Sequence, residues 1–113
     1  NVTGNKLNAV LNQRSQDVLA ANNWNVVQYS VLIHMLAQAS GLVAGELVHV
    51  IADAHIYDRH VDIVKEMIEK EQFEAPKFTI DKSVRDFYDF NKDSFKLADY
   101  RYNDFDAKIE IAI

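Results

Sequence analysis

The sequence places several groups able to bind an anion in one short run, which reads Gln13, Arg14, Ser15, Gln16 and Asp17. A guanidinium can hold a phosphate through two parallel hydrogen bonds, and a serine hydroxyl adds a short donor. The run precedes a predicted helix, whose first N–H groups favour an anion. We therefore expect a site for one phosphate here. The structural alternative is that Asp17 caps the helix and Arg14 pairs with a neighbouring acid.

Asn25 lies at the expected beginning of an apolar helix, directly after Trp24. Its amide can donate one hydrogen bond and accept another, which matches the O4 and N3–H edge of a uracil. Cytosine presents the opposite pattern at these two positions, so an aspartate would suit it better. The structural alternative is again a helix cap, for which asparagine is among the best residues.

A third polar run, Asp53-Ala54-His55-Ile56-Tyr57, lies at the end of a predicted strand. Strand alternation puts Asp53, His55 and Tyr57 on one face, where they are suited to bind a sugar hydroxyl. A hydrogen-bonded network beneath a loop is the alternative. A metal site shared with His49 and His60 is not predicted, because those spacings match no familiar ligand motif.

Hydrophobic periodicity predicts the elements that position these runs. We expect strands over 6–13 and 46–57, a helix over 25–40, an amphipathic helix over 58–71, and short strands around Phe78, Ile80 and 109–113. The 25–40 helix is apolar on nearly every side, which is typical of a buried helix. The fold class is therefore α+β: a mixed or antiparallel twisted sheet with a buried central helix and flanking surface helices.

Composition excludes several classes of function. The chain of 113 residues has no cysteine, which excludes a disulfide framework, a thiolate metal site and a cysteine nucleophile within it. Its net charge of −5, with dispersed basic residues, argues against a nucleic-acid partner. No apolar run is long enough for a membrane span, so we expect a cytoplasmic protein with no membrane partner. The strands need pairing partners, which indicates that the chain is part of a longer polypeptide or an oligomer.

Taken in order, these runs resemble the thymidylate synthase family over the whole chain. Gln13-Arg14-Ser15-x-Asp17 is similar to the family's phosphate and folate segment, and Asn25 occupies the position of its uracil-reading asparagine. The family also shows Met35-Leu36-Ala37-Gln38, the ribose-binding run Asp53 to Tyr57, and the apolar end Ile111-Ala112-Ile113. Residues 1–113 are then the carboxy-terminal part of a single domain of that fold.

The resemblance implies reductive methylation of deoxyuridylate (dUMP) to thymidylate (dTMP), with 5,10-methylenetetrahydrofolate as co-substrate and no metal. Arg14 and Ser15 would bind the phosphate, Asn25 the uracil, and His55 and Tyr57 the ribose 3′ hydroxyl. The full set of implied dUMP-binding residues is Gln13, Arg14, Ser15, Gln16, Asp17, Asn25, His55 and Tyr57. The implied folate contacts are Asp17, Ala21, Ala112 and Ile113, the last two as part of a closing tail.

The chain also departs from the family pattern. The nucleophilic cysteine of the family lies in a Pro-Cys-His segment, which we expect upstream of Asn1, so the 113-residue chain alone should be inactive. Ala21-Asn22-Asn23-Trp24 replaces the common Gly-Leu-Pro-Phe run. The family's homodimer packs sheet against sheet, and either Val48 to Ile56 or Leu7 to Leu11 could supply the face. Two other functions stay open: hydroxymethyl transfer to deoxyuridylate on the same fold, and a non-catalytic nucleotide-binding or interaction module.

Overall fold

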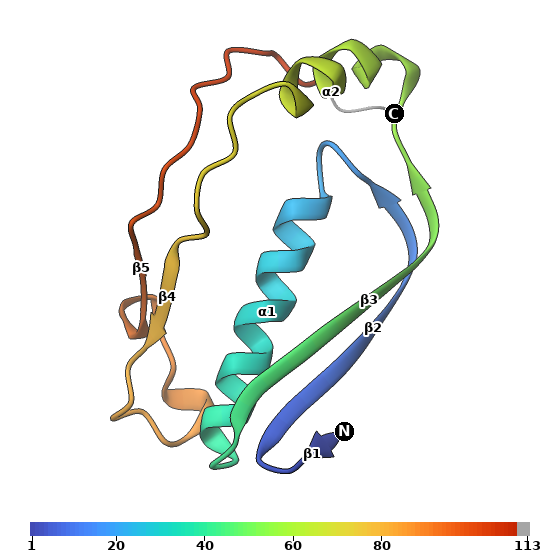
Figure 1. The fold of residues 1–113 in the computed structure, drawn as a ribbon. Helices are drawn as coiled ribbons and strands as arrows, with labels where there is room; N and C mark the ends of the chain where they lie inside the picture. Colours follow the sequence, from blue (N-terminus) through green and yellow to red (C-terminus); the bar gives the residue numbers. More distant parts are fainter. Residues whose placement is uncertain (111–113) are drawn as a thin grey trace.

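The structure is a computed structural model that describes residues 1–110. In chain order it contains β1 (Val2–Thr3), β2 (Lys6–Asp17), α1 (Asn22–Ala39), β3 (Val43–His55), α2 (Val61–Ile68), β4 (Lys77–Ile80) and β5 (Phe95–Ala98). Short 3-10 turns cover Asp58–His60, Phe87–Asp89 and Lys92–Ser94. As Figure 1 shows, α1 lies between a pair of long strands and a pair of short ones. The predicted α+β class is confirmed.

The long sheet is mixed, in the order β1-β2-β3. β2 and β3 run parallel with α1 as their crossover, whereas β1 pairs antiparallel with β2. Backbone pairing continues to Asp17, which lies opposite His55. β2 is therefore longer than the predicted 6–13, because β3 supplies backbone partners through the whole 13–17 run. β1 and β5 were not predicted, since two to four residues carry little periodicity.

Pairing decides which face of the long sheet meets α1. Opposed residues in a sheet share a face, so the pairs Ala9 with Leu47 and Leu11 with His49 lie together. These positions are half-buried, whereas the next pair along, Val10 with Val48, is exposed. The Leu7 to Leu11 face thus packs towards the helix. The alternating valines of β3, which look like a core face in the sequence, lie on the outside.

A bulge between β2 and β3 depends on one glycine. The register shifts between Leu7 and Ala9, and the backbone N–H of Glu46 donates to the Asn8 side-chain oxygen at 2.9 Å. A Cβ on Gly45 would collide with that oxygen and crowd the carbonyl of Leu7. Glycine therefore allows the close approach that the bulge needs.

The bounds of α1 differ from the predicted 25–40 at the amino end. The helix begins at Asn22, so Asn25 lies in its first turn and is not its N-cap, a position held by Ala21. At the other end Gly41 adopts a φ of 68°, with Gly41 N–H donating to Gln38 O and Leu42 N–H to Ala37 O. This is the pattern of a Schellman motif, and it confirms the predicted glycine stop.

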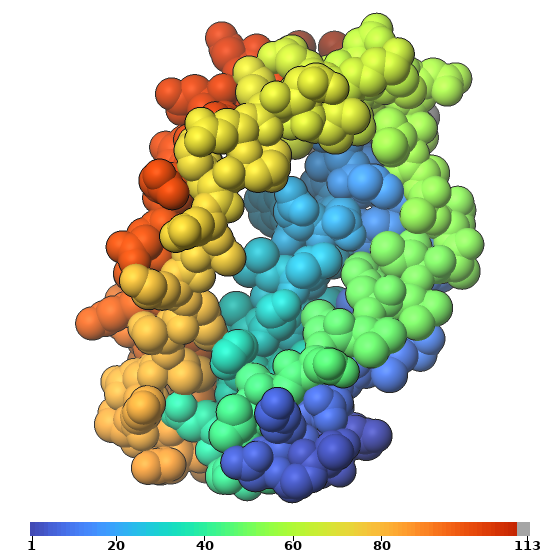
Figure 2. All heavy atoms as spheres, in the orientation of Figure 1, coloured from blue at the N-terminus to red at the C-terminus, as the bar shows by residue number. Residues whose placement is uncertain are grey.

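Within residues 1–110, α1 is central but covered only in part. Its fully buried residues are Ile33 and Ala37, whereas Trp24 is 80% exposed. Figure 2 shows the molecule hollowed around the amino-terminal half of the helix. The radius of gyration is 16.7 Å, against about 13 Å for a compact domain of this length. The expected burial on every side is thus not found within these residues, because few elements are present to supply it.

An aromatic cluster covers the carboxy-terminal half of α1. The His34 ring lies 5.0 Å from Phe78 of β4, which stacks on Phe95 of β5 at 6.1 Å. Gln38 adds a polar tie, since its Nε2 donates to the carbonyls of Asp81 and Val84 at 2.7 Å each. In the same turn, hydrogen bonds from the backbone and hydroxyl of Ser83 lower the pKa of Asp81.

The last third agrees with the prediction only in part. The helix predicted over 58–71 is a 3-10 turn followed by the shorter α2, Val61–Ile68. β4 confirms the strand expected around Phe78 and Ile80. Ile109 is not in a strand, and Ile111 and Ile113 lie outside the described residues. From 99 to 110 the chain follows the surface without helix or strand.

The tie at Gln38 leads to the first prediction. Gln38→Met keeps the side-chain length but removes both donors, so the free energy of unfolding should fall by about 1–2 kcal/mol. Gln28→Met on the exposed side of the same helix is the matched control. Chemical denaturation monitored by circular dichroism measures both. Equal stability of the two variants would show that the tie contributes nothing.

Candidate functional site

The residues singled out by the sequence come together at one end of the molecule. Because β2 and β3 are parallel and in register to Asp17 and His55, their carboxyl ends meet at the same edge. The first turn of α1 follows β2 after a short turn and lies at this end as well (Figure 1). Ligands of parallel sheets bind at the carboxyl ends of the strands. This edge, residues 13–17 and 53–57 with Asn25, is the candidate site.

Gln13 organises the interior of the site. His49 Nε2 lies 2.8 Å from Gln13 Oε1, and since that oxygen only accepts, the imidazole nitrogen donates. Gln13 Nε2 in turn donates to Asn25 Oδ1 at 3.3 Å and to the Ser15 carbonyl at 3.0 Å. The donors therefore run in one direction, from His49 through Gln13 to Asn25. This fixes which way the Asn25 amide is turned.

Once its orientation is fixed, the Asn25 amide has a defined set of hydrogen-bonding groups left for a ligand. Its Oδ1 retains a second lone pair, and its Nδ2 retains two hydrogens for a ligand. An adjacent donor and acceptor of this kind match the edge of a planar heterocycle. The helix-cap alternative for Asn25 is wrong, because its backbone N–H is already bonded within the helix to Ala21 O at 3.1 Å.

Arg14 lies on the opposite face of β2 from Gln13, and it is exposed. Among residues 1–110 the ion pairs involve other cations, so the alternative in which Arg14 pairs with a neighbouring acid is not found there. The half-buried Ser15 is the next residue of the strand. A guanidinium without an acidic partner in the described part of the chain is available for an anion.

Gln16 and Asp17 close the run. Gln16 is buried, and its Nε2 donates to the Asp17 carbonyl at 3.2 Å, while its Oε1 has no hydrogen-bond partner among residues 1–110. Asp17 Oδ1 accepts from the backbone N–H of Ala20 at 3.0 Å. Asp17 therefore stabilises the turn before α1. The alternative in which it caps the helix itself is wrong, since α1 has no side-chain cap.

The end of β3 carries a row of three rings. His55 packs edge-on against Tyr57 with centroids 5.2 Å apart, and Tyr57 packs edge-on against His60 at 5.9 Å. His55 Nδ1 lies 3.3 Å from the Asp53 carbonyl and 3.7 Å from its carboxylate. The structure thus brings His55 and Tyr57 together as predicted, although β3 ends at His55 and Tyr57 lies beyond the strand.

Two members of this region were missed as site residues. His49 entered the sequence analysis only as a metal ligand, although alternation with Ile51 and Leu47 places it on the inner face, opposite Leu11 and close to Gln13. The sequence around His60 does not indicate that this histidine is buried. Of the expected folate contacts, Ala21 is half-buried before α1, whereas Ala112 and Ile113 lie outside the described residues.

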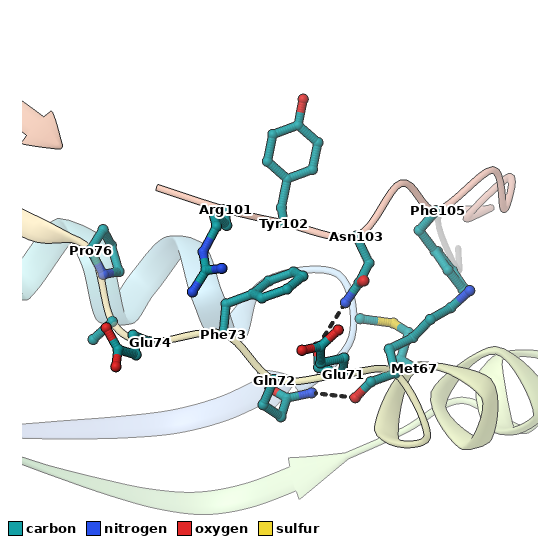
Figure 3. Close-up of a pocket in the computed structure, with 12 residues that line it drawn as sticks. Met67, Glu71, Gln72, Phe73, Glu74, Pro76, Arg101, Tyr102, Asn103 and Phe105 are labelled. Atoms are coloured by element: carbon teal, nitrogen blue, oxygen red, sulfur yellow. Dashed lines mark hydrogen bonds between the residues drawn. The ribbon is translucent and has the colours of Figure 1, made fainter. Parts of the chain in front are cut away.

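A shallow pocket of about 310 Å³ lies away from these residues. Its walls come from the end of α2, the following segment 70–76 and residues 101–105. Figure 3 shows Asn103 reaching the Glu71 backbone, and Arg101 beside the ring of Phe73. None of the predicted site residues lines this pocket, so it is not the candidate site.

The described part of the chain offers neither a metal site nor a membrane span. Within residues 1–110, no three His, Cys, Asp or Glu side chains lie close enough together to hold a metal ion. In that part of the chain, too, no helix combines the length and the apolar character that crossing a membrane requires.

Comparison with known proteins points to one family. The family model described as thymidylate synthase matches residues 1–113. A thymidylate synthase of Bacillus mojavensis is 48% identical over 99 residues, or 88% of this chain and 36% of that protein. Thymidylate synthase 1 of Bacillus subtilis strain 168 is 46% identical over the same shares of each chain. The solved structure of the thermostable thymidylate synthase A from Bacillus subtilis superposes with a TM-score of 0.94 at 44% identity, covering 99% of this chain and 40% of that one.

The network around Gln13 gives the second prediction. Gln13→Met removes the acceptor for His49 and the donors to Asn25 and Ser15, which should lower the free energy of unfolding by about 1–3 kcal/mol. The Asn25 side-chain amide should also lose its fixed orientation, as measured by NMR relaxation of its Nδ2 group. Gln28→Met is again the control. Unchanged order of the Asn25 amide would contradict the directed network.

Proposed function

Because the chain belongs to the thymidylate synthase family over residues 1–113, we propose that it forms the carboxy-terminal part of an enzyme that methylates dUMP to dTMP with 5,10-methylenetetrahydrofolate. The chain spans 36% of the length of the Bacillus mojavensis relative and 40% of the solved thymidylate synthase A. The activity is therefore proposed for the complete polypeptide. The residues described here would supply recognition of the nucleotide and of the folate.

The observation that carries the proposal is the orientation of Asn25 by Gln13. With Oδ1 held by the Gln13 donor, Nδ2 is left to donate to O4 of uracil, and the second lone pair of Oδ1 is left to accept from N3–H. Cytosine would present a donor to the Nδ2 donor. The directed network from His49 thus favours a uracil base.

The other proposed nucleotide contacts lie along the same edge, because the two strands that carry them are parallel. We assign the phosphate to Arg14 and Ser15, and the ribose 3′ hydroxyl to His55 and Tyr57. An exposed guanidinium and a half-buried hydroxyl suit a phosphate that is only partly desolvated. Gln13, Gln16 and Asp17 complete the proposed dUMP set, and Asp17, Ala21, Ala112 and Ile113 the proposed folate set.

The chemistry itself needs a group that these residues lack. Methyl transfer to C5 requires a nucleophile that adds to C6 and raises electron density at C5, and the 113 residues contain no cysteine. We propose that the thiolate comes from a Pro-Cys-His segment roughly ten residues before Asn1, the length of one more strand. Residues of this chain then orient the base, hold the phosphate and exclude water, while the upstream thiolate forms the bond to C6 of the base held there.

The third prediction tests this activity. The complete polypeptide should release tritium from 5-tritiated dUMP when methylenetetrahydrofolate is present, and the 113-residue chain alone should release none. Arg14→Ala should slow release at low dUMP by about 10- to 100-fold, because a charge-assisted phosphate contact contributes about 1.5–3 kcal/mol. Saturating dUMP should restore most of the rate.

Arg85→Ala is the control for that experiment, since Arg85 lies beside Gln38 and Gly41 at the opposite end of α1. No tritium release from the complete wild-type polypeptide at saturating substrates would overturn the proposed activity. It would favour the non-catalytic nucleotide-binding module instead.

We also propose that the protein is a homodimer through the outer face of β2 and β3. This face carries Val10, which is 62% exposed, and Val48, which is 50% exposed. Apolar side chains exposed side by side on neighbouring strands are typical of a surface that binds a partner. The inner face, which includes Leu7 to Leu11, already packs on α1. Of the two faces that the sequence left open, we therefore propose the outer face with Val48 as the dimer interface.

The fourth prediction concerns this face. Val48→Asp places a carboxylate twice in a two-fold interface, which should weaken dimerisation by more than about tenfold. Sedimentation velocity on the complete polypeptide measures the change. Thr79→Asp, on an exposed position of the other sheet, should leave the dimer intact. A dimer insensitive to Val48→Asp would place the interface elsewhere.

A further inference from the structure

His60 is a buried histidine whose contacts are not accounted for by nucleotide binding. It is 1% exposed, at the end of the 3-10 turn that precedes α2. Its Nε2 lies 3.0 Å from the backbone carbonyl of Glu110. A carbonyl only accepts, so Nε2 carries the hydrogen and donates it. The other ring nitrogen, Nδ1, has no hydrogen-bond partner among residues 1–110.

The bond from His60 differs from the other contacts that hold the segment 99–110. Asn103 donates to the Glu71 carbonyl at 2.8 Å, Arg101 covers the ring of Phe73 at 4.9 Å, and Lys70 covers Phe105 at 5.5 Å. The first two appear in Figure 3 at the open surface of the shallow pocket. Water competes with such surface contacts. A donor held by a buried ring is shielded from that competition, so breaking its bond leaves an unsatisfied group and costs more.

The same ring touches the candidate site. His60 packs edge-on against Tyr57, which packs edge-on against His55, and the backbone N–H of His60 donates to the Tyr57 carbonyl at 2.8 Å. One rigid turn therefore carries both the ribose-side rings and the donor to Glu110. The sequence places Ala112 and Ile113 directly after Ile111, so Glu110 is the last described residue before them.

We propose that His60 is a positioning residue that anchors the carboxy-terminal segment at Glu110 and couples it to the rings of Tyr57 and His55. The effect of His60 on folate binding rests on the proposed function, whereas its effect on how firmly the segment 99–110 is held does not.

Limited proteolysis tests the anchor without any activity. The Lys108 side chain is 88% exposed, and trypsin cleavage after it releases the peptide 109–113. In the complete polypeptide, His60→Ala should speed this cleavage roughly fivefold, as expected for loss of one hydrogen bond when cleavage follows local opening. His60→Gln keeps an N–H donor and should cleave at close to the wild-type rate. Mass spectrometry of the released peptide gives the rates.

His34→Ala is the matched control, since His34 is a half-buried histidine that packs on Phe78, far from Glu110 in the sequence. It should leave cleavage after Lys108 unchanged. Wild-type cleavage in His60→Ala would overturn the anchor. If His60→Ala speeds cleavage at every basic residue, the Gln variant decides: restored protection at Lys108 supports the anchor, and equally fast cleavage overturns it.

A kinetic readout then separates positioning from general structural support. In the tritium-release assay, His60→Ala should raise the KM for methylenetetrahydrofolate about fivefold, with the Kd for dUMP alone changed less than twofold, because Glu110 precedes the proposed folate contacts Ala112 and Ile113 in the sequence. Equal losses for both ligands would contradict the coupling. A wild-type polypeptide that releases no tritium would remove the proposed function and leave the proteolysis result standing.

Discussion

The parallel pairing of β2 and β3 is the constraint on which the rest of the structure depends. Antiparallel strands would send residues 13–17 and 53–57 to opposite edges of the sheet. Parallel strands require a crossover, and α1 supplies it while packing on the inner face. The two polar runs therefore lie side by side on neighbouring strands, with Ser15 opposite Asp53 and Asp17 opposite His55. The proposed phosphate, base and ribose contacts can share an edge only because this pairing holds.

Within the described residues, the polar groups of the candidate site gather at one edge, whereas few apolar side chains are fully buried. Gln13 has three hydrogen-bond partners at this edge, whereas fully buried apolar residues are limited to Ile33 and Ala37 within the described part of the chain. An exposed Trp24 and an exposed valine face on the sheet mark surfaces that further elements or a second subunit would cover. The Bacillus mojavensis relative and the solved thymidylate synthase A are both more than twice the length of this chain.

Local pattern predicted much of the secondary structure, for identifiable reasons. The α1 helix, both long strands and the stop at Gly41 follow from sustained periodicity and from the one residue type that readily adopts a φ of 68°. Periodicity failed where elements are short, as in β1 and β5, and where a strand continues through polar residues, as β2 does to Asp17. It also left open which face of each strand packs on α1. Strand pairing decides this, because the side of β3 that packs is the one whose neighbours on β2 face the helix.

By itself, the sequence determined the chemical groups that these 113 residues offer: a guanidinium and a hydroxyl suited to a phosphate, an amide suited to a base edge, an imidazole and a phenol suited to a sugar hydroxyl, and no thiol. These are properties of residue type and order, which no fold can change. Tertiary structure alone decided the geometry. The orientation of Asn25 comes from Gln13 and His49, and the hold on Glu110 comes from His60, 50 positions earlier in the chain. Contacts between residues so far apart depend on how strands pair and turns pack, and local pattern carries no record of that.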